Sequence, residues 1–467
     1  MRDVAYTELT EKCAVFGAFG VGSGAARLTF FGLWALQHRG QENSGIVSSD
    51  GKRLYRHTAP GLVANVYREE DLEQLPGTTA IGHNRYSTSG AADNSHAQPA
   101  FMCGRDYAFA HNGNLPSTKA LEIFLDARGV DGATLNDSEM MAAAIGVYIE
   151  DGLSLGEAVV KAYPLFTGTF ASVAMGKDQL VAFRDECGIR PLSLARLGKG
   201  YIVASETCAF DTIGATHIRD IEPGELIVID RQGVHSRQVV AKRPKLDIFE
   251  LVYFARPDSI ILGKSVNEVR QNLGRELAQE YRIQADIVVP VPDSAIPAAL
   301  GYANASGIPF EMGLIKNRYI HRTFIRPTAK LREQDLQMKL NPMPQVLSGK
   351  RVILIDDSIV RGTTTQKMTR MLYEAGAQEV HLLISSPPVK YPDFYGINTP
   401  DQKELIAARM SVEEIRKHLG ADSLGYLSYK GMIRATGQPA NVFSTSCFTG
   451  VYPIPIGERK ADFSYIE

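Results

Sequence analysis

Short runs of apolar residues, separated by polar turns, dominate the first half of the chain. Between residue 13 and about residue 230 these runs include CAVFGAFG, SGIVSS, DYAFAHNG, FASVAM and GELIVID. Their length and their content of valine, isoleucine and aromatic residues are typical of β-strands. Two stretches, 119–128 and 138–150, have helical character instead. Strands in runs with few helices predict a layered α+β domain.

The pattern changes after a basic, proline-containing segment at 237–246, which lacks periodicity. Beyond it, helical and apolar strand patterns alternate. The predicted helices are 266–282, 296–304 and 365–375, and the predicted strands are 286–290, 351–355 and 380–384. Such alternation predicts a doubly wound, mostly parallel sheet. We therefore predict two domains, 13–240 and 241–467, of which the second ends in a C-terminal extension.

The composition narrows the class of protein. A chain of 467 residues exceeds one ordinary hydrophobic core, and its net charge of −2 argues against a bulk nucleic-acid binder. The five cysteines are scattered and form no C-x-x-C pair, which is not typical of a disulfide scaffold or a structural zinc site. Residues 1–12 lack the apolar core of a secretion signal, and no apolar run reaches the length of a membrane span. We expect a cytoplasmic protein without nucleic-acid or membrane partners.

The strongest single motif is VILIDDSIVRGTTTQK at 352–367. An apolar strand leads into two aspartates, and a loop with an arginine and a glycine then leads into three threonines and a helix. Backbone N–H groups and hydroxyls at a helix N-terminus suit a phosphate, while paired carboxylates suit a ribose diol or a hydrated Mg²⁺. An ordinary strand end followed by a helix cap needs only one Asp, Ser or Thr, whereas this motif has two aspartates and three threonines. The motif therefore predicts a phosphate site at the carboxyl end of a strand.

The stretch ELTEKCAVFG at 8–17 places Cys13 where a polar start gives way to the first predicted strand. Taken alone, a cysteine in this position is a small buried hydrophobe. Similarly, HNG at 111–113 alone is a turn, and Asp137 in NDSE alone is a helix cap. As a nucleophile, the Cys13 thiol needs a base. A free α-amine with a pKa of about 7.7–8.0 serves this purpose if residues 1–12 are removed.

Both sets of motifs resemble the glutamine phosphoribosylpyrophosphate (PRPP) amidotransferases. Segment 352–367 is similar to the PRPP motif of type I phosphoribosyltransferases, and PVPDSAIPAA, KNRYIHRTFIRP and LREQDLQMKL resemble further segments of that family. LQHRGQENSGI, GHNRYSTSG, AHNGNL and NDSE stand in the order seen in N-terminal-nucleophile (Ntn) glutamine amidotransferases. The resemblance extends from residue 13 to about residue 453. It implies a four-layer αββα glutaminase domain followed by a doubly wound phosphoribosyltransferase domain.

The resemblance also assigns roles in the first domain. Cys13 attacks the side-chain amide of glutamine after a prosegment, residues 1–12, has been removed. Asn112 and the backbone N–H of Gly113 form the oxyanion hole, where each donor contributes about 3 kcal/mol in comparable sites. The residues matched to glutamine binding are Arg85, which holds the α-carboxylate, Asp137, which holds the α-amino group, and Arg39 and Thr88, which support the pocket.

In the second domain the resemblance assigns a PRPP site and a Mg²⁺ site. The residues matched to PRPP binding are Asp356, Asp357, Arg361, Gly362, Thr363, Thr364, Thr365 and Lys339. Those matched to the metal are Ser294, Asp356 and Asp357. Basic residues of the segments around 316–340 match the charge of a pyrophosphate.

Members of this family with a short prosegment often hold a [4Fe–4S] cluster on four cysteine thiolates. At the matching positions this chain has Asp247, Asp393 and Ser444, and only Cys447 is kept. Carboxylate and hydroxyl oxygens are poor ligands for a soft cluster. We therefore expect no iron–sulfur cluster, and polar contacts between the domains at Asp247 and Asp393.

By this resemblance the chain is an amidophosphoribosyltransferase, a pentosyltransferase of purine biosynthesis. It hydrolyses glutamine and transfers the ammonia to PRPP, which releases pyrophosphate and gives 5-phosphoribosylamine. Purine nucleotides as inhibitors and a homo-oligomer, either dimer or tetramer, are also implied. The alternatives are a non-catalytic homologue that senses PRPP or purine nucleotides, an ammonia-only synthase that keeps its prosegment, and a glutaminase with another synthase partner. A dinucleotide site at GAFGVGSGAAR (17–27) is disfavoured, because no βαβ unit follows.

Overall fold

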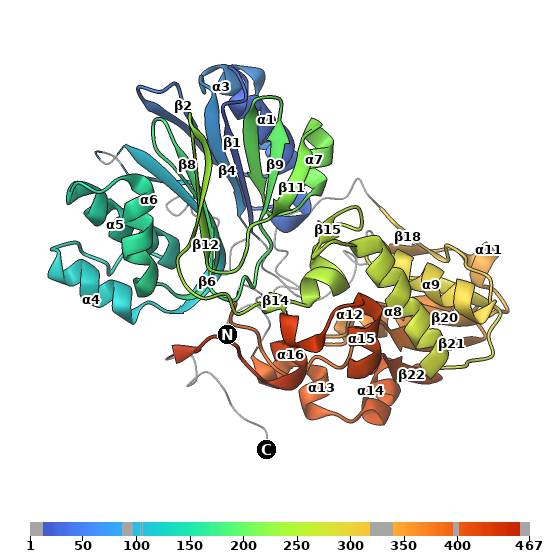
Figure 1. Ribbon diagram of the computed structural model, residues 1–467. Coiled ribbons are helices and arrows are strands. Elements are labelled where there is room, and N and C mark those ends of the chain that lie inside the picture. Colours follow the sequence, from blue (N-terminus) through green and yellow to red (C-terminus); the bar gives the residue numbers. More distant parts are fainter. Residues whose placement is uncertain are drawn as a thin grey trace.

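The computed structural model describes residues 13–85, 97–102, 104, 106–317, 340–395 and 401–457. Two parts are visible in Figure 1: a stack of sheets and helices built from the first half of the chain, and a helix-covered sheet built from the second half. Thr88 and Lys339, which the sequence matched to the two sites, lie outside the described residues, as do residues 1–12. No helix within the described ranges is long and apolar enough to cross a membrane.

Two antiparallel sheets form the centre of the first part. The seven-stranded sheet has the order β11-β9-β10-β1-β4-β2-β3, and the six-stranded sheet has the order β13-β12-β8-β7-β6-β5. The strands of the first sheet are β1 (Ala14–Phe19), β2 (Asn43–Ser49), β3 (Leu54–Pro60), β4 (Thr79–Arg85), β9 (Ser193–Leu197), β10 (Gly200–Ala204) and β11 (Thr216–Asp220). Those of the second are β5 (Ala100–Met102), β6 (Tyr107–Ser117), β7 (Thr167–Met175), β8 (Leu180–Arg184), β12 (Glu225–Asp230) and β13 (Gly233–Gln238).

Helices cover the outer face of each sheet, so the layers run helix, sheet, sheet, helix (Figure 1). The helices are α1 (Ala25–Ala35) and α7 (Cys208–Ile213) on the first sheet, and α4 (Lys119–Ala127), α5 (Asp137–Glu150) and α6 (Leu155–Ala162) on the second. Separate apolar clusters fill the space under each helical layer and the space between the sheets, where Val15 and Ile81 face Val173. This confirms the predicted αββα arrangement.

The second part is built on a parallel sheet with the order β17-β20-β21-β22. Its strands are β17 (Ile287–Pro290), β20 (Arg351–Asp356), β21 (Glu379–Ile384) and β22 (Ser423–Tyr426). Its main helices are α8 (Val266–Glu280), α9 (Ile296–Ser306), α12 (Thr363–Glu374), α14 (Val412–Leu419) and α15 (Tyr429–Thr436). Helix α8 packs against α9 and α15, whereas α12 packs against α14.

The chain reverses its direction across this sheet between β17 and β20. After β17 and α9 it forms a parallel bridge from Phe310 to Val288 of β17, and β20 pairs with the opposite edge of β17. Because parallel crossovers are right-handed, α9 and α12 cover opposite faces, as a doubly wound fold requires. Ligands of such sheets bind where the order reverses, outside the carboxyl ends of the strands. The topology therefore points to the loops that follow Pro290 and Asp356.

A short connecting region joins the two parts. Strand β14 (Leu246–Asp247) pairs in parallel with β23 (Phe443–Ser444), and the π-helical segment η4 (Glu250–Phe254) follows directly. An apolar cluster crosses the interface here, with Cys187 and Ile189 from the first part against Tyr395 and neighbouring residues from the second. The two candidate sites are consequently held in one packed structure.

Candidate active sites in the two domains

Cys13 lies at the start of β1, next to the centre of the first sheet. In the antiparallel pairing of β1 with β4, Ala14 is opposite Asn84, so the register places Cys13 opposite Arg85. The backbone N–H of Val15 donates to Ser205 Oγ (3.0 Å), which ties the beginning of β1 to the residue after β10. Among the described residues Cys13 forms no disulfide bond, and it is only partly buried. A strand end therefore presents the thiol beside an arginine.

Asn112 and Gly113 lie inside β6, so HNG is part of a strand rather than a turn. Asn112 is 3% exposed, and among the described residues its amide Nδ2 has no hydrogen-bond partner. Gly113 has a φ of 154°, and an added Cβ would lie 2.0 Å from the backbone oxygen of Thr169. Only glycine fits such a position. Since buried amides are rarely left unpaired, Asn112 is suited to receive an oxygen atom from a ligand.

Asp137 begins α5, but it does not cap this helix. The cap is Asn136, whose side chain accepts a hydrogen bond from Glu139 N in a capping box. Asp137 instead accepts from Leu115 N (3.2 Å) and Ser138 N (2.8 Å) and keeps its side chain partly exposed. A carboxylate held in this way can bind an amino group without losing its own support.

Buried polar side chains connect these elements across the sheets. His83 of β4 contacts the backbone oxygen of His111 in β6 through Nε2 (3.1 Å), and Gln98 accepts from His111 N (2.7 Å). Burial, followed by the charge of Arg85, lowers the pKa of His83 to about 3, so its imidazole is neutral. This contact ties the end of β4, where Arg85 lies, to the strand that carries Asn112.

Arg39 lies in a fully buried ion network that the sequence did not reveal. Its guanidinium donates to Glu206 of the first part and, at 2.9 and 2.6 Å, to Glu250 of η4. Its Nε also lies 3.3 Å from the backbone oxygen of Cys13. Burial alone would raise the pKa of Glu206, but His38 and Arg39 hold it well below its ordinary value. Arg39 is therefore an anchor of the Cys13 backbone.

In the second part, the two predicted aspartates lie at the end of β20 and are both 6% exposed. Asp357 accepts hydrogen bonds from Ser294 Oγ (2.5 Å) and Ser358 Oγ (2.7 Å), and Ser294 belongs to the loop after β17. The chain reversal between β17 and β20 thus brings Ser294 to Asp357, as the predicted metal site requires. Mg²⁺ is commonly bound by one or two carboxylates together with water and substrate phosphates, so this set fits the ion.

The glycine and threonines form the N-terminus of α12. Gly362 is the residue before the helix, with a φ of 81°, and an added Cβ would lie 2.8 Å from Ile406 Cδ1. Thr363 is exposed, whereas Thr364 is half-buried and Thr365 is buried. Arg361 forms an ion pair with Glu404 (Nη2 to Oε2, 2.6 Å), a partner that sequence reasoning missed. The backbone N–H groups at this helix end are suited to donate hydrogen bonds to a phosphate.

The positions matched to cluster cysteines lie together and are buried. Asp247 pairs with Ser444 in the β14–β23 ladder, and the charges of Asp247 and Asp393 both act on Cys447. The two carboxylates already accept hydrogen bonds: Asp393 from Tyr395 N and Ser446 Oγ, and Asp247 from Phe249 N. Across the described ranges no group of three or more histidine, cysteine or acidic side chains is arranged for a metal ion. Oxygen donors that are already occupied do not fit an iron–sulfur cluster.

This buried junction makes stability depend on pH. Burial and the charge of Asp393 raise the pKa of Asp247 far above its ordinary 3.8, although Arg190 opposes the shift. The unfolded chain releases this proton near pH 4 and the folded chain keeps it, so stability falls as the pH rises above that value. We expect Asp247→Asn to gain several degrees in Tm relative to the wild type between pH 5 and 8. Thermal unfolding across this range tests the prediction.

A control for that measurement is Asp50→Asn. Hydrogen bonds from Arg53 and Lys52 lower the pKa of this exposed carboxyl to about 2, so it is ionised in both states above pH 5. Its Tm difference from the wild type is expected to stay constant. A constant difference for Asp247→Asn would contradict the shift at Asp247.

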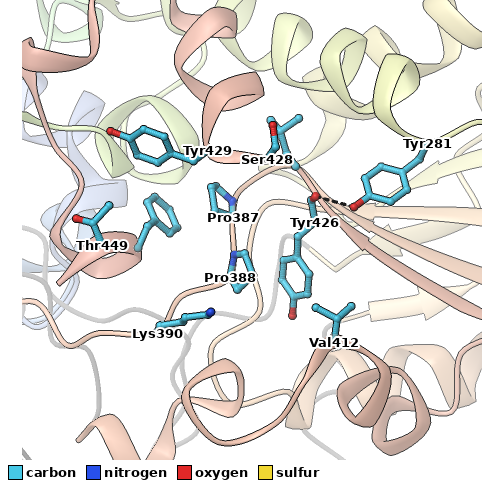
Figure 2. A pocket seen from close by; sticks show the side chains of 11 residues that line it. Tyr281, Pro387, Pro388, Lys390, Val412, Tyr426, Ser428, Tyr429 and Thr449 are labelled. Atoms are coloured by element: carbon cyan, nitrogen blue, oxygen red, sulfur yellow. Dashed lines mark hydrogen bonds between the residues drawn. The ribbon is translucent and has the colours of Figure 1, made fainter. Parts of the chain in front are cut away.

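One hollow in the described part of the molecule is lined by none of the residues assigned to either site. It has a volume of about 400 Å³ and opens beside the carboxyl ends of β21 and β22. Figure 2 shows the rings of Tyr281, Tyr426 and Tyr429 around Pro387 and Pro388, with the Tyr281 hydroxyl bonded to the backbone oxygen of Tyr426 (2.9 Å). Neither predicted site includes these side chains.

Comparison with known proteins agrees with this geometry. A glutamine amidotransferase domain model matches residues 83–212, and a phosphoribosyl transferase domain model matches residues 262–386. The amidophosphoribosyltransferase of a Synechocystis species is 48% identical over 453 residues, which cover 96% of this chain and 92% of that protein. The amidophosphoribosyltransferase of Bacillus subtilis is 44% identical over 456 residues, covering 96% and 95%.

Solved structures give the same answer. The B. subtilis glutamine PRPP amidotransferase, complexed with ADP and GMP, has a TM-score of 0.89 at 44% identity and covers 96% of this chain and 98% of its own. A structure described as the allosteric regulatory enzyme of purine biosynthesis has a TM-score of 0.90 at 42% identity, covering 97% and 100%. From its sequence, its two domains and its fold, this chain belongs to the amidophosphoribosyltransferase family.

Proposed function

We propose that the chain makes 5-phosphoribosylamine from PRPP with the nitrogen of glutamine, and that Cys13 becomes its N-terminal nucleophile after residues 1–12 are removed. The proposal keeps the domain bounds 13–240 and 241–467. The single observation that carries the first half is the buried Asn112 amide, which has no acceptor among the described residues. Such a donor can stabilise the negative charge that develops on the amide oxygen of the substrate only during the reaction.

In the first domain the free α-amine of Cys13 takes the thiol proton, and the thiolate attacks the amide carbon of glutamine. Asn112 and Gly113 N–H stabilise the oxyanion of the tetrahedral intermediate. The protonated α-amine gives its proton to the departing ammonia, and water then hydrolyses the thioester to glutamate. Arg85 and Asp137 hold the two charged groups of the amino acid, because a guanidinium and a carboxylate match them.

In the second domain, ammonia forms a bond with C1 of PRPP while the bond from C1 to the pyrophosphate oxygen breaks. Asp356 and Asp357 bind the ribose side, and the N-terminus of α12 binds the 5-phosphate. Bound Mg²⁺ supplies charge neutralisation for the leaving pyrophosphate. Ser294 and Asp357, which already contact each other at 2.5 Å, support such an ion. Lys339 is proposed as a further cation toward the pyrophosphate.

We further propose that the ammonia passes inside the protein from the first site to the second, and isotope-labelled glutamine tests this. The enzyme is given glutamine labelled with ¹⁵N at its amide, together with unlabelled ammonium at similar concentration and a trap for the amine product. Internal transfer predicts a product that carries ¹⁵N almost completely. A product diluted to the isotope ratio of the solution would show that ammonia equilibrates outside the protein.

Removing the oxyanion donor is expected to impair only the first reaction. Asn112→Ala deletes the unpartnered amide without removing an existing hydrogen bond from the described protein, so it leaves the fold intact. We expect kcat with glutamine to fall about 10²- to 10³-fold, with ammonia-dependent activity unchanged. Steady-state assays of pyrophosphate release with each nitrogen source measure this. An equal loss with both sources would assign Asn112 to folding instead.

Four finer points complete the proposal. Purine nucleotides act as inhibitors, supported by the B. subtilis relative solved with ADP and GMP. The chain carries no iron–sulfur cluster, supported by the occupied oxygens of Asp247 and Asp393, and iron analysis of anaerobically purified protein tests this. A cytoplasmic location and a homodimer or homotetramer remain predictions from the sequence and the resemblance.

A further inference from the structure

A strip of buried charges crosses from the first domain to the second. Arg39 and Arg190, both 1% exposed, belong to the first domain, and Glu250, fully buried, belongs to η4 of the second. Arg39 makes a two-pronged contact with Glu250, and Arg190 Nη1 lies 3.1 Å from the same carboxylate. A two-pronged arginine–carboxylate contact fixes the geometry of both side chains. Glu250 is therefore rigidly joined to the glutaminase domain.

Arg39 is also the contact that reaches the nucleophile. Its Nε donates to the backbone oxygen of Cys13 (3.3 Å), the residue directly before β1, whose pairing with β4 begins at Ala14. Arg39 thus supports the backbone of the residue that directly precedes the strand. Its own position depends on two carboxylates, Glu206 from the first domain and Glu250 from the second.

The segment that carries Glu250 is held in turn by Arg270 of α8. This buried guanidinium donates from Nε to the backbone oxygen of Leu251 (2.9 Å) and from Nη2 to that of Ala255 (2.8 Å), which brackets η4. Asp357 exerts the strongest opposing electrostatic effect on Arg270, whose pKa burial lowers to about 10. The segment η4 is therefore held by Arg270 through its backbone and by Arg39 through the side chain of Glu250.

We infer that Glu250 is a positioning residue of the glutamine site, supplied by the phosphoribosyltransferase domain, and that it acts through Arg39 on the backbone of Cys13. The inference rests on the proposed role of Cys13.

The test uses the full-length enzyme with Glu250→Gln, which keeps the size of the side chain and removes its charge. We expect kcat for glutamine hydrolysis to fall at least tenfold while KM for glutamine stays within twofold, because the nucleophile and not the binding pocket is disturbed. Ammonia-dependent pyrophosphate release is expected to stay within twofold.

Two further variants keep this test decisive. If Glu250→Gln does not fold, Arg270→Lys takes its place. This variant keeps the positive charge but cannot bond the backbone oxygens of both Leu251 and Ala255. It is expected to lower the ratio of glutamine- to ammonia-dependent activity, as Glu250→Gln does. The control is Arg243→Gln, an exposed contact between the domains that pairs with Glu186 (2.6 Å) and does not contact the strip. Its ratio of glutamine- to ammonia-dependent activity is expected to match the wild type.

The outcomes separate this inference from the proposed function. A parallel loss of both activities in Glu250→Gln, or no change in either, overturns the positioning role of Glu250. If Cys13→Ala abolishes glutamine use while Glu250→Gln does not affect it, only the inference fails. If Cys13→Ala retains glutamine use, the proposed function of the first domain fails as well.

Discussion

Cys13→Ala is expected to abolish glutamine-dependent pyrophosphate release, by at least about 10³-fold, because removal of a covalent nucleophile leaves only binding and the oxyanion donors. Ammonia supplied directly is expected to support the second reaction within twofold of the wild-type rate. The reason is spatial: Cys13 lies at the start of β1, whereas the phosphoribosyl residues lie at the ends of β17 and β20. Paired assays with glutamine and with ammonium chloride measure both rates.

The matched control for Cys13→Ala is Cys187→Ala. Cys187 is fully buried in the apolar cluster between the domains, and burial raises the pKa of its thiol to about 12, so it does not act as a nucleophile. Its removal is expected to lower thermal stability but to leave pyrophosphate release with glutamine and with ammonia unchanged. Substantial glutamine-dependent turnover by Cys13→Ala would refute the assignment of the nucleophile.

Asp357→Asn is expected to lower pyrophosphate release at least 10²-fold with both glutamine and ammonia. The Asp357 carboxylate is buried and accepts hydrogen bonds from Ser294 and Ser358. Because it is proposed to bind both the ribose and the metal, a neutral amide in its place is expected to weaken both contacts. A smaller loss, about tenfold, is expected for Ser294→Ala. Activity is measured as a function of Mg²⁺ and of PRPP concentration, and the concentration that gives half-maximal activity is expected to rise for both.

Asp286→Asn is a control on the same sheet. Asp286 precedes β17 and pairs with Arg351 (3.0 Å) at the amino end of β20, the edge opposite the proposed site. Because the pair is accessible to solvent, its loss is expected to cost little stability and to leave activity unchanged. Equal losses in Asp286→Asn and Asp357→Asn would mean that the sheet, and not a site at its carboxyl edge, is affected.

The phosphoribosyl half was the easier part to predict, because its chemistry is continuous in sequence. One segment of sixteen residues holds the strand, both acids, the glycine and the helix start, and the structure forms all of them in that order. Ser294 is more than sixty residues from Asp357, yet the resemblance placed it at the metal, and the chain reversal between β17 and β20 brings the two together.

The glutaminase half depended far more on tertiary contacts. Helix α1, AARLTFFGLWA, was not predicted, because apolar residues surround it on nearly every side and leave no polar face to mark the period. The network of Arg39 with Glu206 and Glu250 joins residues 167 and 211 positions apart. In a single sequence such charges are indistinguishable from solvated surface residues. HNG also lay in a strand, because pairing with β7 outweighs the local preference for a turn.

The most direct test of the account is the N-terminus of the active enzyme, determined by intact mass and N-terminal sequencing of the protein that shows glutamine-dependent pyrophosphate release. We expect a chain that begins at Cys13, with a free α-amine beside the thiol. A fully active enzyme that still carries residues 1–12 would contradict it, because the nitrogen of Cys13 would then be locked in a peptide bond and could not act as the base.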